Sequence, residues 1–272
     1  MLRLIAVVWM GLAGMAWAGP EADTTLRLIH MDAQMQIARE EGLSHAETLN
    51  ENMLGGQGGA LWHSQLDGIY DVPRMVEGAR GPIEALDTAT LERLNLFLGS
   101  ELGQRISDLE LAARTAMMDQ EKEDAARGAY AELQGTDDPR LKAALTIIEA
   151  GDLVERNVST ALTANYQFYR ALVDGGAYAM SDEEILTEVW SQEETLRADT
   201  EAWLMGYLML LMQPLDDDDR ATYVAFMQTP EAGRLNAALF DGMGSVYSDV
   251  TYALGRVLAL NLKALGEGSQ EL

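Results

Sequence analysis

The sequence predicts an all-α protein: a bundle or array of about eight to ten helices, built from two related helix–corner–helix units. Apolar residues recur along most of the chain with a period near that of a helix. No segment shows the sustained alternation of β-branched and polar residues that is typical of a strand. Glycine and proline separate the periodic segments, and a hydrophobic share of 48% is sufficient for a packed core.

Residues 1–18 have the pattern of a secretory signal peptide. Arg3 precedes an apolar run, and an A-x-A-like cleavage site follows at 16–18. The run is shorter than the ~20 residues that a membrane-spanning helix needs. We therefore expect a periplasmic protein with no membrane span after cleavage. Because the chain contains no cysteine, it has no disulfide bond to stabilise it.

The charge balance limits the classes of partner. The chain carries 44 Asp and Glu against 19 Lys and Arg, a formal net charge of −25. Nucleic-acid binding requires basic side chains that neutralise phosphates, so no nucleic-acid partner is expected. Anionic membrane surfaces are disfavoured for the same reason. Another periplasmic protein, or a second copy of the chain, remains a possible partner.

The first unit is predicted at residues 19–130. A helix over 22–41 is expected to end at Gly42 as a C-terminal cap, and a capping box at 44–47 is expected to open the next helix. The sequence GGQGG then breaks the chain. Further helices are predicted over 61–70, 84–99 and 101–125.

The second unit, residues 138–265, is predicted to follow a linker at 131–137 and to leave a C-terminal tail at 266–272. Asp138 and Pro139 suit the first positions of a long helix that extends to about Val173, with a kink at Gly151. A capping box at 181–184 opens another helix, which is expected to run to Pro214.

The segment AWLMGYLMLLM at 202–212 is apolar on nearly all sides. It is too short to cross a membrane, and therefore predicts a fully buried helix. The alternative is that this segment lines a pocket or a dimer interface, because methionine side chains suit adaptable surfaces. The methionines concerned are Met205, Met209 and Met212.

An internal repeat links the two units. The stretch LDTATLERLNLFLGSELGQR at 86–105 matches LDDDDRATYVAFMQTPEAGR at 215–234, with the aromatic residue and the hydroxyl residue at a constant offset. The glycines pair only if one residue is inserted in the second copy. The repeated structural motif consists of Phe97, Ser100 and Gly103 in the first copy, and of Phe226, Thr229, Pro230 and Gly233 in the second.

The hydroxyl, proline and glycine residues of the motif suit a helix–corner–helix, in which one helix ends and the next begins at a sharp turn. Ser100 and Thr229 suit the N-cap of the following helix, and Pro230 suits its first position. Gly103 and Gly233 lack a side chain, so another helix is expected to pack closely against them. Gly233→Leu is therefore predicted to destabilise the protein more than removal of two aspartates from the acidic run of the second copy.

The pattern Phe-x-x-Ser/Thr-(Pro)-x-Gly, in an exported helical chain, resembles the domain-of-unknown-function 2059 family of bacterial exported proteins. The second copy, FMQTPEAGRLNAALF, is the more similar to it. The first copy, FLGSELGQRI, lacks the proline. The resemblance implies two tandem all-helical units and export. It implies no catalytic residue, because the family has no established activity.

Sequence motifs for catalysis, cofactors or metals are missing. His30, His45 and His63 lack the spacing of metal ligands, although a site assembled in space from all three stays open. No G-x-S-x-G elbow or phosphate-binding loop occurs. The acidic run Asp216–Asp219 favours helix N-terminal capping, with adventitious cation binding as the alternative. We predict no catalytic, cofactor-binding or metal-binding residue.

These observations favour a non-enzymatic protein-interaction or structural module. A carrier or sensor that binds an apolar small molecule between helices is the alternative, and a hydrolase with a spatially assembled site is the least favoured. A cavity of roughly several hundred Å³ with a few polar groups would favour the carrier. A contiguous exposed apolar patch would favour the interaction module.

Overall fold

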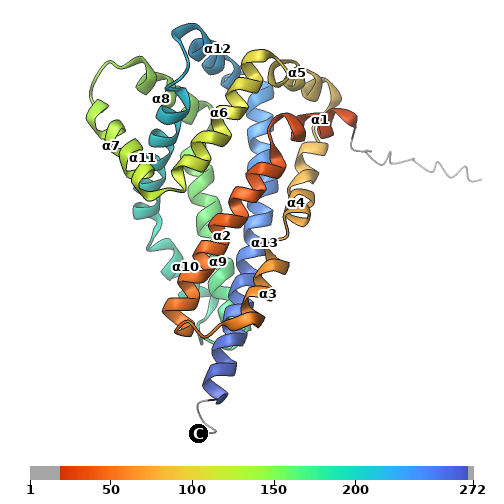
Figure 1. The fold of residues 1–272 in the computed structure, drawn as a ribbon, viewed down its shortest axis with the longest axis vertical. Helices are drawn as coiled ribbons and strands as arrows, with labels where there is room; N and C mark the ends of the chain where they lie inside the picture. The colour runs from red at the N-terminus through yellow and green to blue at the C-terminus, as the bar shows by residue number, and fades with distance from the viewer. Residues whose placement is uncertain (1–18, 269–272) are drawn as a thin grey trace, which may run out of the picture.

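The computed structural model describes residues 19–268, and this part of the chain is helical with no strand, which confirms the all-α class (Figure 1). The predicted signal peptide at 1–18 and the end of the predicted tail, 269–272, lie outside the described residues. The helices are α1 (Pro20–Leu28), α2 (Met31–Leu54), α3 (Gly59–Ile69), α4 (Val72–Glu84), α5 (Thr88–Leu98), α6 (Glu101–Met117), α7 (Gln120–Leu133), α8 (Pro139–Gly151), α9 (Leu153–Asp174), α10 (Asp182–Trp190), α11 (Glu193–Met212), α12 (Asp217–Met227) and α13 (Pro230–Gly268).

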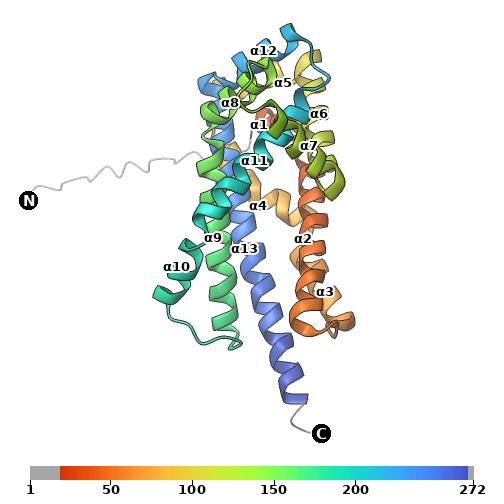
Figure 2. The same ribbon diagram turned by 90° about the vertical axis from the view of Figure 1, so that its left-hand side faces the viewer.

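The long helix α13 organises the bundle. It runs the length of the molecule and packs against α9 and α4, as the two views in Figures 1 and 2 show. The short helices α5 and α12 lie together at one end, where each turns into the helix that follows it. Helix α3 lies towards the other end, beside the C-terminal half of α13, whose last turns extend beyond it.

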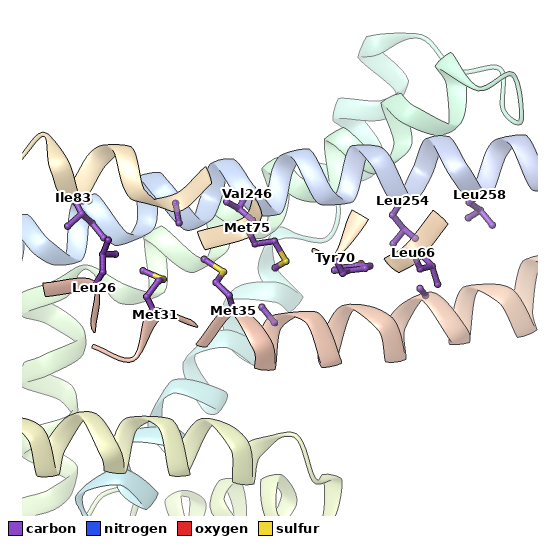
Figure 3. Close-up of a cluster of buried hydrophobic side chains, with 14 of the residues drawn as sticks. Leu26, Met31, Met35, Leu66, Tyr70, Met75, Ile83, Val246, Leu254 and Leu258 are labelled. Carbon is purple, nitrogen blue, oxygen red and sulfur yellow. The ribbon is translucent and has the colours of Figure 1, made fainter. Parts of the chain in front are cut away.

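The two predicted units share one hydrophobic core. Figure 3 shows Met35 of α2 and Met75 of α4 close to Val246 of α13, with Leu254 further along α13. All four side chains are at most 7% exposed. Burial of such side chains is the main stabilising contribution available to a chain without disulfides. The α7 helix, whose first part was assigned to the first unit, packs mainly on α11 of the second.

Several helix starts agree with the predictions. Asp138 caps α8 by accepting the backbone N–H of Arg140, and Pro139 takes the first helical position. The Ser181 capping box is formed, because Ser181 and Glu184 satisfy each other's backbone N–H groups. Each cap is a hydrogen bond between residues only a few positions apart, so the sequence alone can predict it.

The predicted helix end at Gly42 and the capping box at 44–47 are wrong, because α2 continues through both. The Ser44 carbonyl accepts the Thr48 hydroxyl inside the helix. Gly42 makes room for an aromatic ring: a Cβ atom at this position would lie 2.1 Å from Cε1 of Tyr70. Packing against a distant residue therefore explains this glycine, and helix termination does not.

Other predicted long helices are divided, so the described chain has more helices than expected. The kink expected at Gly151 is a full break, with Asp152 in the left-handed region (φ 51°) between α8 and α9. Asp119 caps a separate α7 inside the helix predicted over 101–125. A break at Ser191 and Gln192 separates α10 from α11.

The apolar segment at 202–212 forms the second half of α11, and its methionines 205, 209 and 212 are at most 6% exposed. The prediction of a buried helix is thus confirmed. Among residues 19–268, none of the helices combines the length and the apolar character required to traverse a bilayer.

Candidate functional site

The repeated motif forms two helix corners. Ser100 caps α6 by accepting the backbone N–H of Gly103, and Thr229 caps α13 by accepting that of Ala232. Pro230 is the first residue of α13. The hydroxyl caps and the proline therefore have the roles that the sequence predicts.

These hydrogen bonds correct the register of the repeat. The residue that occupies the position of Gly103 is Ala232, so the second copy has no inserted residue. A Cβ atom on Gly103 would lie 2.0 Å from the carbonyl oxygen of Phe97, which explains the glycine. A Cβ atom on Gly233 would meet nothing within 4 Å. The predicted close packing at Gly233 is therefore wrong, and the geometry no longer supports a large effect of Gly233→Leu.

The two corners contact each other through equivalent residues. The rings of Phe97 and Phe226 stack with centroids 3.7 Å apart and planes 10° apart. Arg105 Nη1 donates to Asp219 Oδ2 at 2.7 Å, and its counterpart Arg234 donates to Thr90 Oγ1, the counterpart of Asp219, at 2.8 Å. The two corners thus contact each other through the same positions of the aligned sequence.

The acidic run caps helix α12. The Asp216 side chain accepts the backbone N–H of Asp219 at 2.9 Å, and Asp217 pairs with Arg220. The capping interpretation of the run is thus confirmed. Within residues 19–268, no group of three or more His, Asp or Glu side chains is arranged to hold a metal ion. The histidine site that the sequence left open is therefore not assembled there.

The stacked rings provide a test of the contact between corners. Phe97→Ala and Phe226→Ala are each expected to destabilise the protein. The double variant should lose about 1 kcal/mol less than the sum of the single losses, because the stack is lost only once. Urea unfolding of the four proteins measures this coupling. Additive losses would contradict an energetic role of the stack.

A cleft runs between the helices, formed by three cavities with volumes of about 240, 290 and 540 Å³. The first lies between the two corners, the second between α2 and α13, and the third between α9, α11 and α13. Neighbouring cavities share lining residues, and Met243 lines all three. The lining is mainly apolar and aromatic, as in many small-molecule sites.

An ion pair lies in the middle of this cleft. Arg114 of α6 donates to both carboxylate oxygens of Glu41 on α2, at 3.2 and 2.6 Å. The guanidinium also lies 5.7 Å from the ring centre of Trp203. Burial disfavours the charge of Arg114, but Tyr247 and Glu41 more than offset this effect, and the pKa of Arg114 is raised. Arg114 is therefore charged and engaged by a bidentate partner.

A second polar group lies at the end of the cleft near the corners. The Tyr223 hydroxyl donates to Glu110 Oε1 at 2.9 Å, and the Tyr207 hydroxyl approaches the Glu110 carbonyl oxygen at 3.5 Å. Burial raises the pKa of Glu110, and the Tyr223 hydrogen bond and the nearby His30 oppose the shift only in part. A carboxyl group with a raised pKa in a cavity is a typical feature of functional sites.

Sequence reasoning missed Glu110 and Arg114, although a signal was present. The apolar stripe of α6 includes Ile106, Ala113 and Met117, which are buried. Glu110 and Arg114 lie one turn apart beside this stripe. Charged residues beside a buried helix stripe require a partner or a ligand, and this requirement is independent of any motif.

The chain matches no protein-family model, no curated protein sequence and no solved structure.

Proposed function

We propose that the protein is an exported, non-enzymatic carrier or sensor that binds a small amphipathic molecule in the cleft between its helices. The observation that carries this proposal is the cleft of three neighbouring, mainly apolar cavities, with the Arg114–Glu41 pair, Glu110 and Asp199 as the charged groups in its lining. Apolar walls supply binding energy, and a small number of polar groups fix the orientation of a ligand. Export is supported by the signal-peptide pattern of residues 1–18 and by the family resemblance of the corners.

The alternative of a protein-interaction module has weaker support. Large exposed apolar side chains are spread over different helices, for example Leu61 on α3, Leu96 on α5 and Leu145 on α8. Only Leu186 and Trp190 share one helix, α10. Isolated apolar side chains are common on protein surfaces, whereas interfaces usually present a contiguous patch.

The corners also support an origin of the chain by duplication. Helices α5 and α12 each have 11 residues, and each is followed by a hydroxyl-capped helix. His30 and Asp152, the non-glycine residues with positive φ among residues 19–268, separate α1 from α2 and α8 from α9. The helix that follows each corner packs on the other unit: α13 contacts α4, and α6 contacts α11. On this proposal the cleft lies between the two units.

Filling the cleft tests the proposed function. The neutral apolar dye N-phenyl-1-naphthylamine is expected to bind the wild-type protein with a saturable rise in fluorescence. Met243→Trp should weaken dye binding by about tenfold or more, because its larger side chain occupies the point where the three cavities meet.

The matched control is Leu96→Trp, which adds the same ring at a position that is 80% exposed. It should bind the dye like the wild type. Circular dichroism and thermal unfolding check that both variants are folded, and Met243→Ala, which enlarges the cavity, provides a second variant. Equal dye affinity in the wild type, Met243→Trp and Met243→Ala would contradict binding in the cleft.

A further inference from the structure

The corner end of the cleft contains a carboxyl group without a cationic partner. Arg114 lies one turn from Glu110 on α6 but pairs with Glu41, and His30 pairs with Asp108. Among residues 19–268, Glu110 therefore has hydrogen bonds but no ion pair. A carboxylate in such a cavity is costly unless a positive charge joins it.

A second acceptor lies on the same face of α6. The Ser107 hydroxyl oxygen is buried and has no hydrogen-bond partner among the described residues. Ser107 is 2% exposed, lines the same cavity as Glu110, and precedes it by one helical turn. Buried hydroxyl groups are almost always paired, so this one indicates a missing hydrogen-bond partner. Glu110 and Ser107 together offer two acceptors to a ligand with several N–H groups.

The remaining lining suits a cation with an apolar body. Three aromatic side chains, Phe97, Tyr223 and Phe226, line the cavity with Glu110. Aromatic rings attract cations within about 6 Å. Apolar residues such as Leu239 and Met243 continue the cavity into the larger part of the cleft. The net charge of −25 also favours the approach of cations over anions.

An anionic head group fits this cleft less well. Arg114 is the arginine among the residues that line the cleft, none of which is a lysine, and both oxygens of Glu41 already occupy it. An anion would have to displace Glu41 and leave that carboxylate unpaired, which is unfavourable in an apolar cleft.

From these contacts we infer that the ligand is a protonated amine with an apolar body, whose ammonium group binds Glu110 and Ser107 while its body extends towards Met243. The inference rests on the proposed function, because it specifies the chemistry of the ligand in the same cleft. Glu110 supplies the carboxyl group that pairs with the ammonium group, Ser107 accepts a second N–H, and Phe97, Tyr223 and Phe226 line the same cavity.

Calorimetric titration of the purified protein at neutral pH with n-octylamine, n-octyltrimethylammonium and n-octanol tests this assignment. The wild type should bind n-octylamine about tenfold more tightly than n-octanol, since a hydrogen bond to a charged group contributes that much. Glu110→Gln should reduce n-octylamine binding to the level of n-octanol. Ser107→Ala should weaken binding of n-octylamine but not of n-octyltrimethylammonium, which has no N–H group.

Asp108→Asn is the matched control, because it removes the same charge from the same helix at a side chain that is 73% exposed. It should keep the preference for n-octylamine. If Asp108→Asn and Glu110→Gln lose the preference equally, the overall negative charge attracts the amine and the assignment to Glu110 is wrong.

The remaining outcomes separate the inference from the proposed function. Equal binding of n-octanol and n-octylamine by the wild type, with both weakened by Met243→Trp, would overturn the inference and leave the carrier function supported. Binding of none of the three probes would overturn both. If Glu110→Gln does not fold, Ser107→Ala decides the matter, because its expected effect differs between the primary and the quaternary ammonium probe.

Discussion

Replacing Gly242 with leucine is expected to destabilise the protein by about 3 kcal/mol or more, because α13 and α4 approach each other at this point with almost no space between their backbones. A Cβ atom on Gly242 would lie 2.3 Å from the carbonyl oxygen of Ala79, and 3.1 Å from its Cα. These are backbone atoms of α4, so a side-chain rotation cannot relieve the overlap. The two helices must separate, which would also expose Val246 and Met75 of the shared core.

Urea unfolding followed by circular dichroism measures this loss, and Gly233→Ala in the same helix is the control. Nothing lies within 4 Å of a Cβ atom on Gly233. Alanine should therefore stabilise the protein by roughly 0.5–1 kcal/mol, since glycine loses more backbone freedom in a helix. A loss in Gly233→Ala as large as that in Gly242→Leu would show that α13 tolerates no substitution, and would contradict the specific contact with α4.

The two glycines show what the sequence can predict and what it cannot. Helical class, and caps such as Ser100 and Ser181, depend on neighbouring residues, and the sequence predicted them correctly. The role of a glycine inside a helix depends on which distant element packs against it. Gly233 follows a recognisable corner, whereas Gly242 has no local signature and contacts a helix far away in the chain.

The contacts in the cleft also join residues that are far apart in the chain, so the sequence alone does not predict them. A helix over 101–125 was predicted, and the positions of its charged residues were visible. Their partners were not, because Arg114 finds Glu41 on α2, and Glu110 finds Tyr223 on α12. The two similar sequence stretches were the better guide: they indicated the two corners, and the structure brings Phe97 and Phe226 together where the cleft ends.

Breaking the central ion pair is expected to have the second large effect on stability. Arg114→Met should reduce the free energy of unfolding by about 2 kcal/mol, because the Glu41 carboxylate would remain in the cleft without its bidentate partner. The loss is smaller than for a fully buried pair, since the Arg114 and Glu41 side chains are 24% and 38% exposed. Methionine keeps most of the apolar contact that the arginine stem makes near Trp203.

The double variant Glu41→Gln/Arg114→Met separates the loss of the pair from the cost of an unpaired charge. It should regain at least half of the stability lost in Arg114→Met, because no charge remains at the site. Lys142→Met, which breaks an exposed pair with Asp137, should show no measurable change under the same urea titration. If the double variant is as unstable as Arg114→Met, the unpaired Glu41 carboxylate is not the cause of the loss, and the expectation is wrong. If it recovers, most of the loss in Arg114→Met is the cost of the unpaired Glu41 carboxylate, and a double variant more stable than the wild type would show that the pair itself is maintained at a net cost.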